Sequence, residues 1–190
     1  MKSRKLKLFL GLGAVSLGLA LVWLVARNPA LELPRPPRLD QLEPQLSAYL
    51  SSELDRMGSR SRRAEDHSRI GLIAAVNGLW HEAAFAFSNS VVLKPDQPLA
   101  LMYWGVAAQE INELENAIDL FRRCTTEHPQ FMPGFYRLGF ALLARGSAAE
   151  AEAAFAELTR GEPGEWRGHA GLGECKLRLG KPGEALVPLQ

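Results

Sequence analysis

The stretch GLWHEAAFAFSNSVVLKP, residues 78–95, has the apolar spacing of an amphipathic helix that ends in proline. Nearly the same pattern returns as NELENAIDLFRRCTTEHP at residues 112–129 and as GSAAEAEAAFAELTRGEP at residues 146–163. Each copy begins 34 residues after the previous one. Because one helical pattern recurs at a fixed spacing, the sequence indicates a repeat architecture.

Four classes of residue keep this period of 34. The glycines are Gly71, Gly105, Gly139 and Gly173, the alanines Ala83, Ala117, Ala151 and Ala185, the large apolar residues Phe87, Phe121, Phe155 and Leu189, and the prolines Pro95, Pro129 and Pro163. Small residues suit places where two helices cross closely, and phenylalanine fills the space beside them. Proline ends the second helix of a pair because it lacks the backbone N–H.

These positions predict four helix-turn-helix units at residues 64–97, 98–131, 132–165 and 166–190. One helix pair cannot bury its own apolar stripe, so the units are expected to stack into an all-α, right-handed α-solenoid. The fourth unit stops inside its expected second helix, which leaves Leu186 and Leu189 without a neighbour. We therefore expect the chain to be a fragment that continues with further repeats or another domain in the parent protein.

The repeat resembles the tetratricopeptide repeat (TPR) family. The family pattern runs aromatic, two residues, Leu-Gly, two residues, Tyr, then Ala, three residues and Phe, then Pro. The third unit matches it at Phe135, Leu138, Gly139, Leu142, Ala151, Phe155 and Pro163, and the second unit at Leu101, Trp104, Gly105, Ala108, Ala117, Phe121 and Pro129. The first unit departs from it with His67 at the aromatic place, and the fourth with His169 and with Lys176 at the tyrosine place.

The resemblance covers residues 64–190 and implies a function as well as a fold. Similar solenoids bind peptides or protein segments in a groove lined by the first helix of each unit. The corresponding positions in this chain are Arg69, Leu72, Val76, Leu99, Met102, Tyr103, Val106, Tyr136, Arg137, Phe140 and Leu143. The lysine and asparagine clamp of the chaperone-tail-binding members is not expected, because its places in the first unit hold Ser68 and Leu72.

Residues 8–26, LFLGLGAVSLGLALVWLVA, carry no charge and match the roughly 20 residues that cross a bilayer. Residues 1–7 hold four basic residues, which favours a cytoplasmic N-terminus with the repeats outside, in the periplasm of a bacterial inner-membrane protein. The alternative is a signal peptide that is cleaved from a secreted or periplasmic protein. Leu24 argues against it, because cleavage after Ala26 would need a small residue there. The prediction is a single-pass membrane protein.

Residues 27–40 form the next segment. It contains four prolines and predicts an extended stand-off linker. Residues 41–63 predict one amphipathic helix with Pro44 in its first turn and Gly58 as its stop, followed by a solvated basic connection, GSRSRR.

The charge balance and the motifs exclude several functions. Beyond residue 27 the chain holds 17 basic and 21 acidic residues, which argues against nucleic acid as a partner. The two cysteines and four histidines have no metal-site spacing, and no P-loop, GxSxG or other catalytic pattern is present, so we expect no enzyme activity, cofactor or metal. Two hypotheses remain: a membrane-tethered scaffold that binds a partner protein, or the docking arm of a membrane-anchored enzyme or carrier whose active domain lies beyond residue 190.

Overall fold

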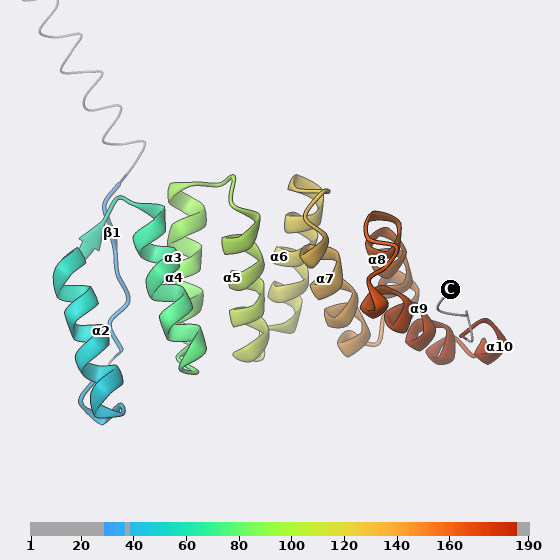
Figure 1. The fold of residues 1–190 in the computed structure, drawn as a ribbon, viewed down its shortest axis with the longest axis horizontal. Coiled ribbons are helices and arrows are strands. Elements are labelled where there is room, and N and C mark those ends of the chain that lie inside the picture. Colours follow the sequence, from blue (N-terminus) through green and yellow to red (C-terminus); the bar gives the residue numbers. More distant parts are fainter. Residues whose placement is uncertain (1–28, 37–38, 186–190) are drawn as a thin grey trace, which may run out of the picture.

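The structure is a computed structural model that describes residues 29–36 and 39–185. Its helices stand side by side along one long axis (Figure 1) and confirm the prediction of an all-α helical-repeat solenoid. The pairs are α3 (Ala64–Val76) with α4 (Trp80–Leu93), α5 (Pro98–Glu110) with α6 (Leu114–Glu127), α7 (Met132–Arg145) with α8 (Ala148–Gly161), and α9 (Trp166–Arg178) with the short α10 (Pro182–Ala185). Successive pairs begin 34 residues apart, at the first residues of the sequence repeats.

The turn inside each pair also follows the period. Its backbone has a positive φ at Gly78 (73°), Asn112 (65°), Gly146 (90°) and Gly180 (74°). Three of these places hold glycine and one holds asparagine, the side chain that tolerates this region of φ best. The chain therefore reverses direction in the same way in all four units.

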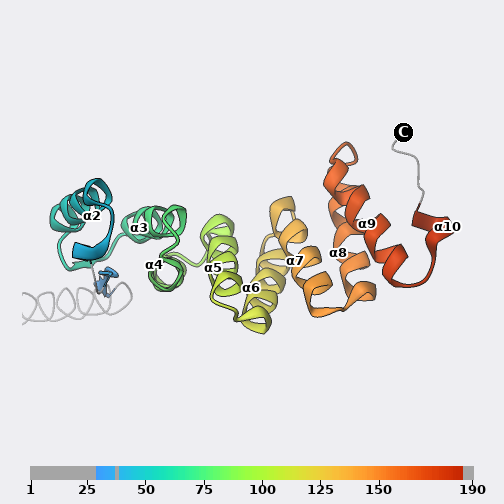
Figure 2. The ribbon, with the colours of Figure 1, turned by 90° about the horizontal axis from the view of Figure 1, so that it is seen from below.

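The two helices of a pair lie in different rows of the stack (Figure 2). First helices of successive units contact each other directly, α5 with α7 and α7 with α9, whereas α4, α6 and α8 make no comparably close contacts with one another. The first helices consequently form the inner row of the stack, and we call its solvent-facing side the inner face.

Phenylalanine from each second helix fills the space left by glycine on the first. A Cβ atom at Gly105 would lie 2.5 Å from Phe121 Cε1, and one at Gly139 would lie 2.6 Å from Phe155 Cζ. Both phenylalanines are fully buried. The predicted pairing of small and large residues is thus the core of the repeats.

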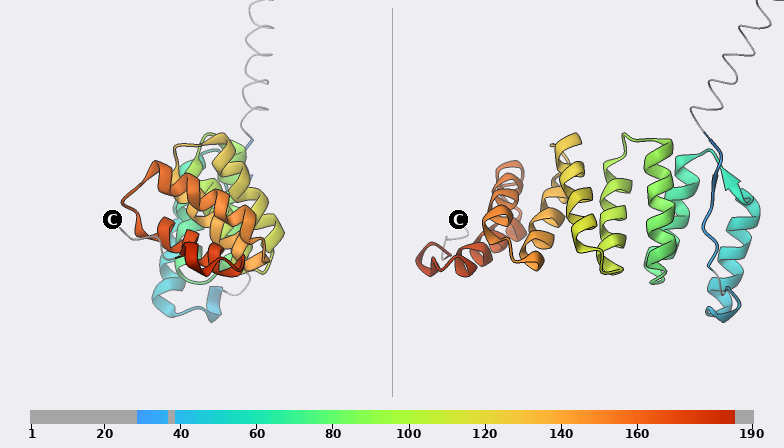
Figure 3. Two further views of the ribbon diagram at one scale, coloured as in Figure 1. Left: turned by 90° about the vertical axis from the view of Figure 1, so that its right-hand side faces the viewer. Right: turned by 180° about the vertical axis from the view of Figure 1, so that it is seen from behind.

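The N-terminal end differs from the expected stand-off linker. Residues 31–36, here called the strap, run between α2 (Pro44–Met57) and α3 (Figure 3). The strand β1 (Leu31–Glu32) pairs antiparallel with β2 (Arg60–Ser61), and a 3-10 helix (Leu39–Gln41) precedes α2. Leu33 is buried, as are the prolines at 34 and 36. The GSRSRR connection is likewise partly ordered, because Ser61 is buried in this pairing.

The strap and α2 together form the N-terminal cap. Leu33 of the strap and Leu54 of α2 pack with Ile70 and Ala86 of the first unit, and Met57 and Ile73 border this cluster. The first unit has no preceding repeat to cover its apolar end. A proline-rich strand, which cannot extend a helix but can lie flat against one, supplies that cover instead.

The predicted membrane span, residues 8–26, lies outside the described residues, as do residues 186–190 of the fourth unit. Among the described residues, none of the helices has the length and apolar character needed to cross a membrane.

Candidate partner-binding groove

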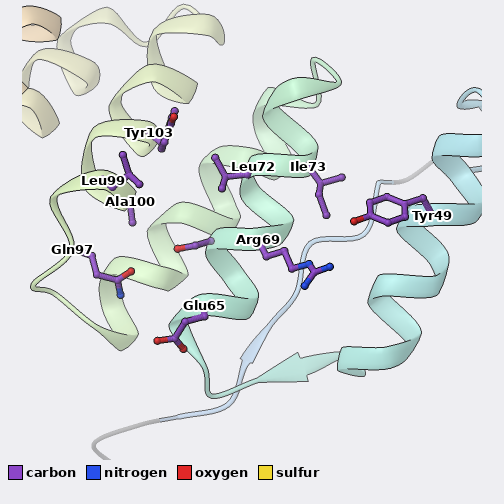
Figure 4. Close-up of a pocket in the computed structure, with 10 residues that line it drawn as sticks. Tyr49, Glu65, Arg69, Leu72, Ile73, Gln97, Leu99, Ala100 and Tyr103 are labelled. Atoms are coloured by element: carbon purple, nitrogen blue, oxygen red, sulfur yellow. The ribbon is translucent and has the colours of Figure 1, made fainter. Parts of the chain in front are cut away.

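A pocket of about 410 Å³ opens on the inner face between α2, α3 and α5 (Figure 4). We call it the N-terminal pocket. Its apolar lining, here called the floor, consists of Leu72, Ile73, Leu99 and Ala100. The other lining residues are polar or aromatic: Tyr49, Glu65, Ser68, Arg69, Gln97 and Tyr103.

The N-terminal pocket brings together four of the residues predicted for the groove: Arg69, Leu72, Leu99 and Tyr103. Leu72 is 39% exposed and Leu99 is 51% exposed, although both side chains are apolar. Tyr103 is half-buried and stacks on Phe87, with ring centroids 5.5 Å apart. Val76 is 85% exposed near the end of α3 and does not line this pocket.

A second pocket, of about 340 Å³, includes the predicted groove residues Tyr136 and Arg137. The Tyr136 ring lies below two guanidinium groups, with the Cζ atoms of Arg137 and Arg167 at 5.8 and 6.0 Å from its centroid. Arg167 also forms an ion pair with Glu165 at 3.0 Å. These cation–π contacts restrain the Tyr136 ring, so it is less available to a partner than an aromatic side chain without such contacts.

Two predicted groove residues face inward instead, and a third is packed against neighbouring rings. Met102 is 6% exposed and Leu143 is 3% exposed, so neither offers a surface to a partner. Phe140 is 37% exposed, but its ring packs edge-on against Phe155 at 5.1 Å and against Tyr136 at 4.9 Å. A helix in the middle of the stack is covered by its neighbours, as α7 is by α5, α6, α8 and α9. The surface that it exposes on the inner face is therefore narrower than the family pattern suggested. Val106 is half-buried against the core for the same reason.

One residue of the N-terminal cap lines the pocket, a second contacts a lining residue, and neither was predicted. Tyr49 of α2 forms one wall of the N-terminal pocket. Glu53, one turn further along α2 and only 8% exposed, places Oε2 2.9 Å from Nε of Arg69. The repeat pattern carried no signal for either residue, because α2 lies outside the period.

Cys124 and Cys175 are buried free thiols, and burial raises the pKa of each to about 11. In the described part of the chain, no group of three or more His, Cys, Asp or Glu residues is arranged to hold a metal ion. The groove offers apolar surface, aromatic rings and fixed charges, which are the means of binding a peptide or protein surface.

The fold and groove define a helical-repeat protein with an open binding face. Two family profiles, both described as tetratricopeptide repeat, match residues 99–130 and 136–190. The chain therefore contains tetratricopeptide repeats in these regions.

Solved structures support the same fold. A crystal structure of MamA is 23% identical with a TM-score of 0.63, and the match covers 74% of this chain and 78% of that one. MamA from Desulfovibrio magneticus RS-1 is 19% identical with a TM-score of 0.62, over 78% and 82% of the two chains. The crystal structure of YrrB, described as a TPR protein with an unusual peptide-binding site, is 18% identical with a TM-score of 0.61, over 75% and 73%. At these identities the likeness extends to the fold.

Proposed function

We propose that this chain is a membrane-tethered scaffold that binds a segment of a partner protein along the inner face of its first helices. The observation that carries the proposal is the N-terminal pocket, where Leu72 and Leu99 leave apolar surface exposed beside fixed charges. Exposed apolar surface in a concave site is typical of protein-binding grooves. The peptide-binding site described for YrrB, which shares the fold, supports the same assignment. The role is binding and not catalysis.

The tether is proposed from the sequence of residues 8–26, and the basic residues before it favour repeats outside the cytoplasm. A secreted phosphatase fused after Gln190 should be active, and the fusion should stay in the membrane fraction after a carbonate wash. N-terminal sequencing that starts at Arg27 or later would show a cleaved signal peptide and would contradict the tether.

Photocrosslinking in cells tests the groove. We expect a photoreactive residue at Leu99 to capture one discrete partner. Val92 on α4 is the matched control, because it is 62% exposed and apolar but lies on a second helix, away from the inner face. Equal labelling from both positions, or none from position 99, would contradict binding in the groove.

A further inference from the structure

One carboxylate forms ion pairs with two arginines at the α2 side of the N-terminal pocket. Glu53 Oε2 lies 3.0 Å from Nη2 of Arg56 and 2.9 Å from Nε of Arg69. The hydrogen bond from Arg56 lowers the pKa of Glu53, so this carboxylate stays ionised at neutral pH. Asp66 also acts electrostatically on Glu53 and Arg56, so this side holds two guanidinium groups and two carboxylates. An acidic ligand would therefore be bound through the free donors of Arg69 and not through a surplus of positive charge.

Arg69 keeps hydrogen-bond donors for a ligand. Its contact with Glu53 uses Nε, and neither of its Nη atoms has a partner among residues 29–36 and 39–185. Its side chain is 53% exposed, and Figure 4 shows it beside Tyr49 at the pocket. A guanidinium fixed through one nitrogen presents the other two in a rigid plane, which suits a carboxylate.

The opposite side of the same pocket is negative. Glu65 lies one turn before Arg69 on α3 and forms no ion pair with any residue in the described part of the chain. Figure 4 shows it away from Tyr49, at the side where Gln97 lies. An acidic group placed there would be repelled, so the two sides of the pocket select opposite charges.

We propose that the N-terminal pocket binds a partner segment through an acidic side chain at Arg69 and an adjacent apolar side chain on the floor of Leu72, Leu99 and Ala100. This inference rests on the proposed binding of a protein segment by the groove. Glu53 acts as a positioning residue, because it holds the Arg69 guanidinium without touching the ligand. The cap helix α2 therefore contributes to specificity as well as covering the end of the solenoid.

The test measures binding of the full chain to three pools of capped, dye-labelled decapeptides. The pools are random except for a central Glu-Leu, Gln-Leu or Lys-Leu pair, and capping removes the terminal charges. We expect the Glu-Leu pool to bind about fivefold more tightly than the Gln-Leu pool, as for a partly exposed charge-assisted hydrogen bond. Arg69→Gln should bring this ratio close to one without weakening binding of the Gln-Leu pool.

Two further variants separate charge from folding. Glu53→Gln should lower the Glu-Leu to Gln-Leu ratio while circular dichroism shows unchanged helix content. Glu65→Gln removes a charge one turn away on the same helix and should leave the ratio unchanged or raise it. A ratio that falls as far in Glu65→Gln as in Arg69→Gln would overturn the inference.

The binding results also separate this inference from the proposed function. If all three pools bind equally well, or the Lys-Leu pool binds best, the groove binds peptides but the acidic preference is wrong. If no pool binds and the photoreactive residue at position 99 captures nothing, the proposed function fails together with the inference.

Discussion

The middle of the solenoid and its N-terminal end cover apolar surface in different ways. In the second and third units, buried phenylalanine meets glycine on the neighbouring helix, as with Phe155 and Gly139, and the same contact recurs from unit to unit. At the N-terminal end, the strap and α2 cover the apolar surface with residues that have no counterparts in the repeats. Packing in the middle is repeated and non-directional, whereas packing at the end combines an apolar cluster with individual hydrogen bonds.

One of those hydrogen bonds connects distant parts of the chain, and the others are local. Asn89 Nδ2 on α4 donates to the backbone oxygen of Glu32 at 2.9 Å, and Ser61 Oγ donates to Asp66 at 2.7 Å. His67 is fully buried with Nε2 3.3 Å from the backbone oxygen of Ser61. The stability of a cap with such contacts should depend on pH and on single polar side chains. The stability of the repeats should depend mainly on the volume of their buried side chains.

The largest expected effect is in the middle. Phe155→Ala removes a fully buried ring that fills the space beside Gly139 and Gly171, and should lower the free energy of unfolding by about 3–5 kcal/mol. Phe85→Ala is the matched control, because Phe85 is 45% exposed and its loss should cost less than about 1 kcal/mol. Urea denaturation followed by circular dichroism measures both. Similar losses in the two variants would show that the ring at position 155 is not the main contact between units.

The second largest effect is a pH dependence of stability that comes from His67, next to the cap. Burial lowers the pKa of His67 below its usual value of 6.5. Between that folded pKa and 6.5 the unfolded chain binds a proton that the folded chain does not, so the free energy of unfolding falls as the pH falls below 6.5. His67→Phe keeps a ring at the aromatic place of the repeat and should remove this dependence.

Urea denaturation at a series of pH values from about 7.5 to about 5.5 measures this pH dependence of the free energy of unfolding. Glu127 does not interfere in this range. The Arg123 hydrogen bond lowers the pKa of Glu127 below 4.5, so its stabilising contribution is lost only at lower pH, as the pH falls through its folded pKa. An identical slope in wild type and His67→Phe would contradict the assignment to His67.

The smallest effect tests the strap. Asn89→Ala removes one hydrogen bond to Glu32 and should cost about 1 kcal/mol. Hydrogen exchange should speed up at the amide of Leu33, which donates to the Ser59 oxygen at 3.1 Å, and stay unchanged in α7. Asn116→Ala is the control, because its side chain bonds only to nearby Glu113 on the surface. Unchanged exchange at Leu33 would show that the strap is held by its apolar contacts alone.

The sequence predicted the repeats well because their contacts are local and periodic. Phe121 and Gly105 lie in one unit, and each has a counterpart 34 residues away, so the pattern can be recognised without knowing the structure. The cap contacts have no such signal. Glu32 and Asn89 are 57 residues apart, and nothing in either segment marks the other as its partner.

The groove was predicted in part for a related reason. Leu72 and Leu99 are exposed as expected, but Met102 and Leu143 are buried. Helical spacing shows which residues share a face, but the width of the free stripe depends on how closely the neighbouring helices approach. Tyr49 and Glu53 could not be assigned to the groove from the repeat, because α2 has no equivalent in the other units.

The pairing of the strap with α4 has a consequence for the order of events during synthesis. A ribosome adds about 5–20 residues per second, so the 57 residues between Glu32 and Asn89 take about 3–11 seconds to appear. Gly139 and Phe155 are only 16 residues apart, and their contact becomes available within about 1–3 seconds. The strap thus waits longer for its partners than Gly139 does. The first part of the cap to leave the ribosome stays unburied until α4 has been made, which gives a chaperone time to bind it.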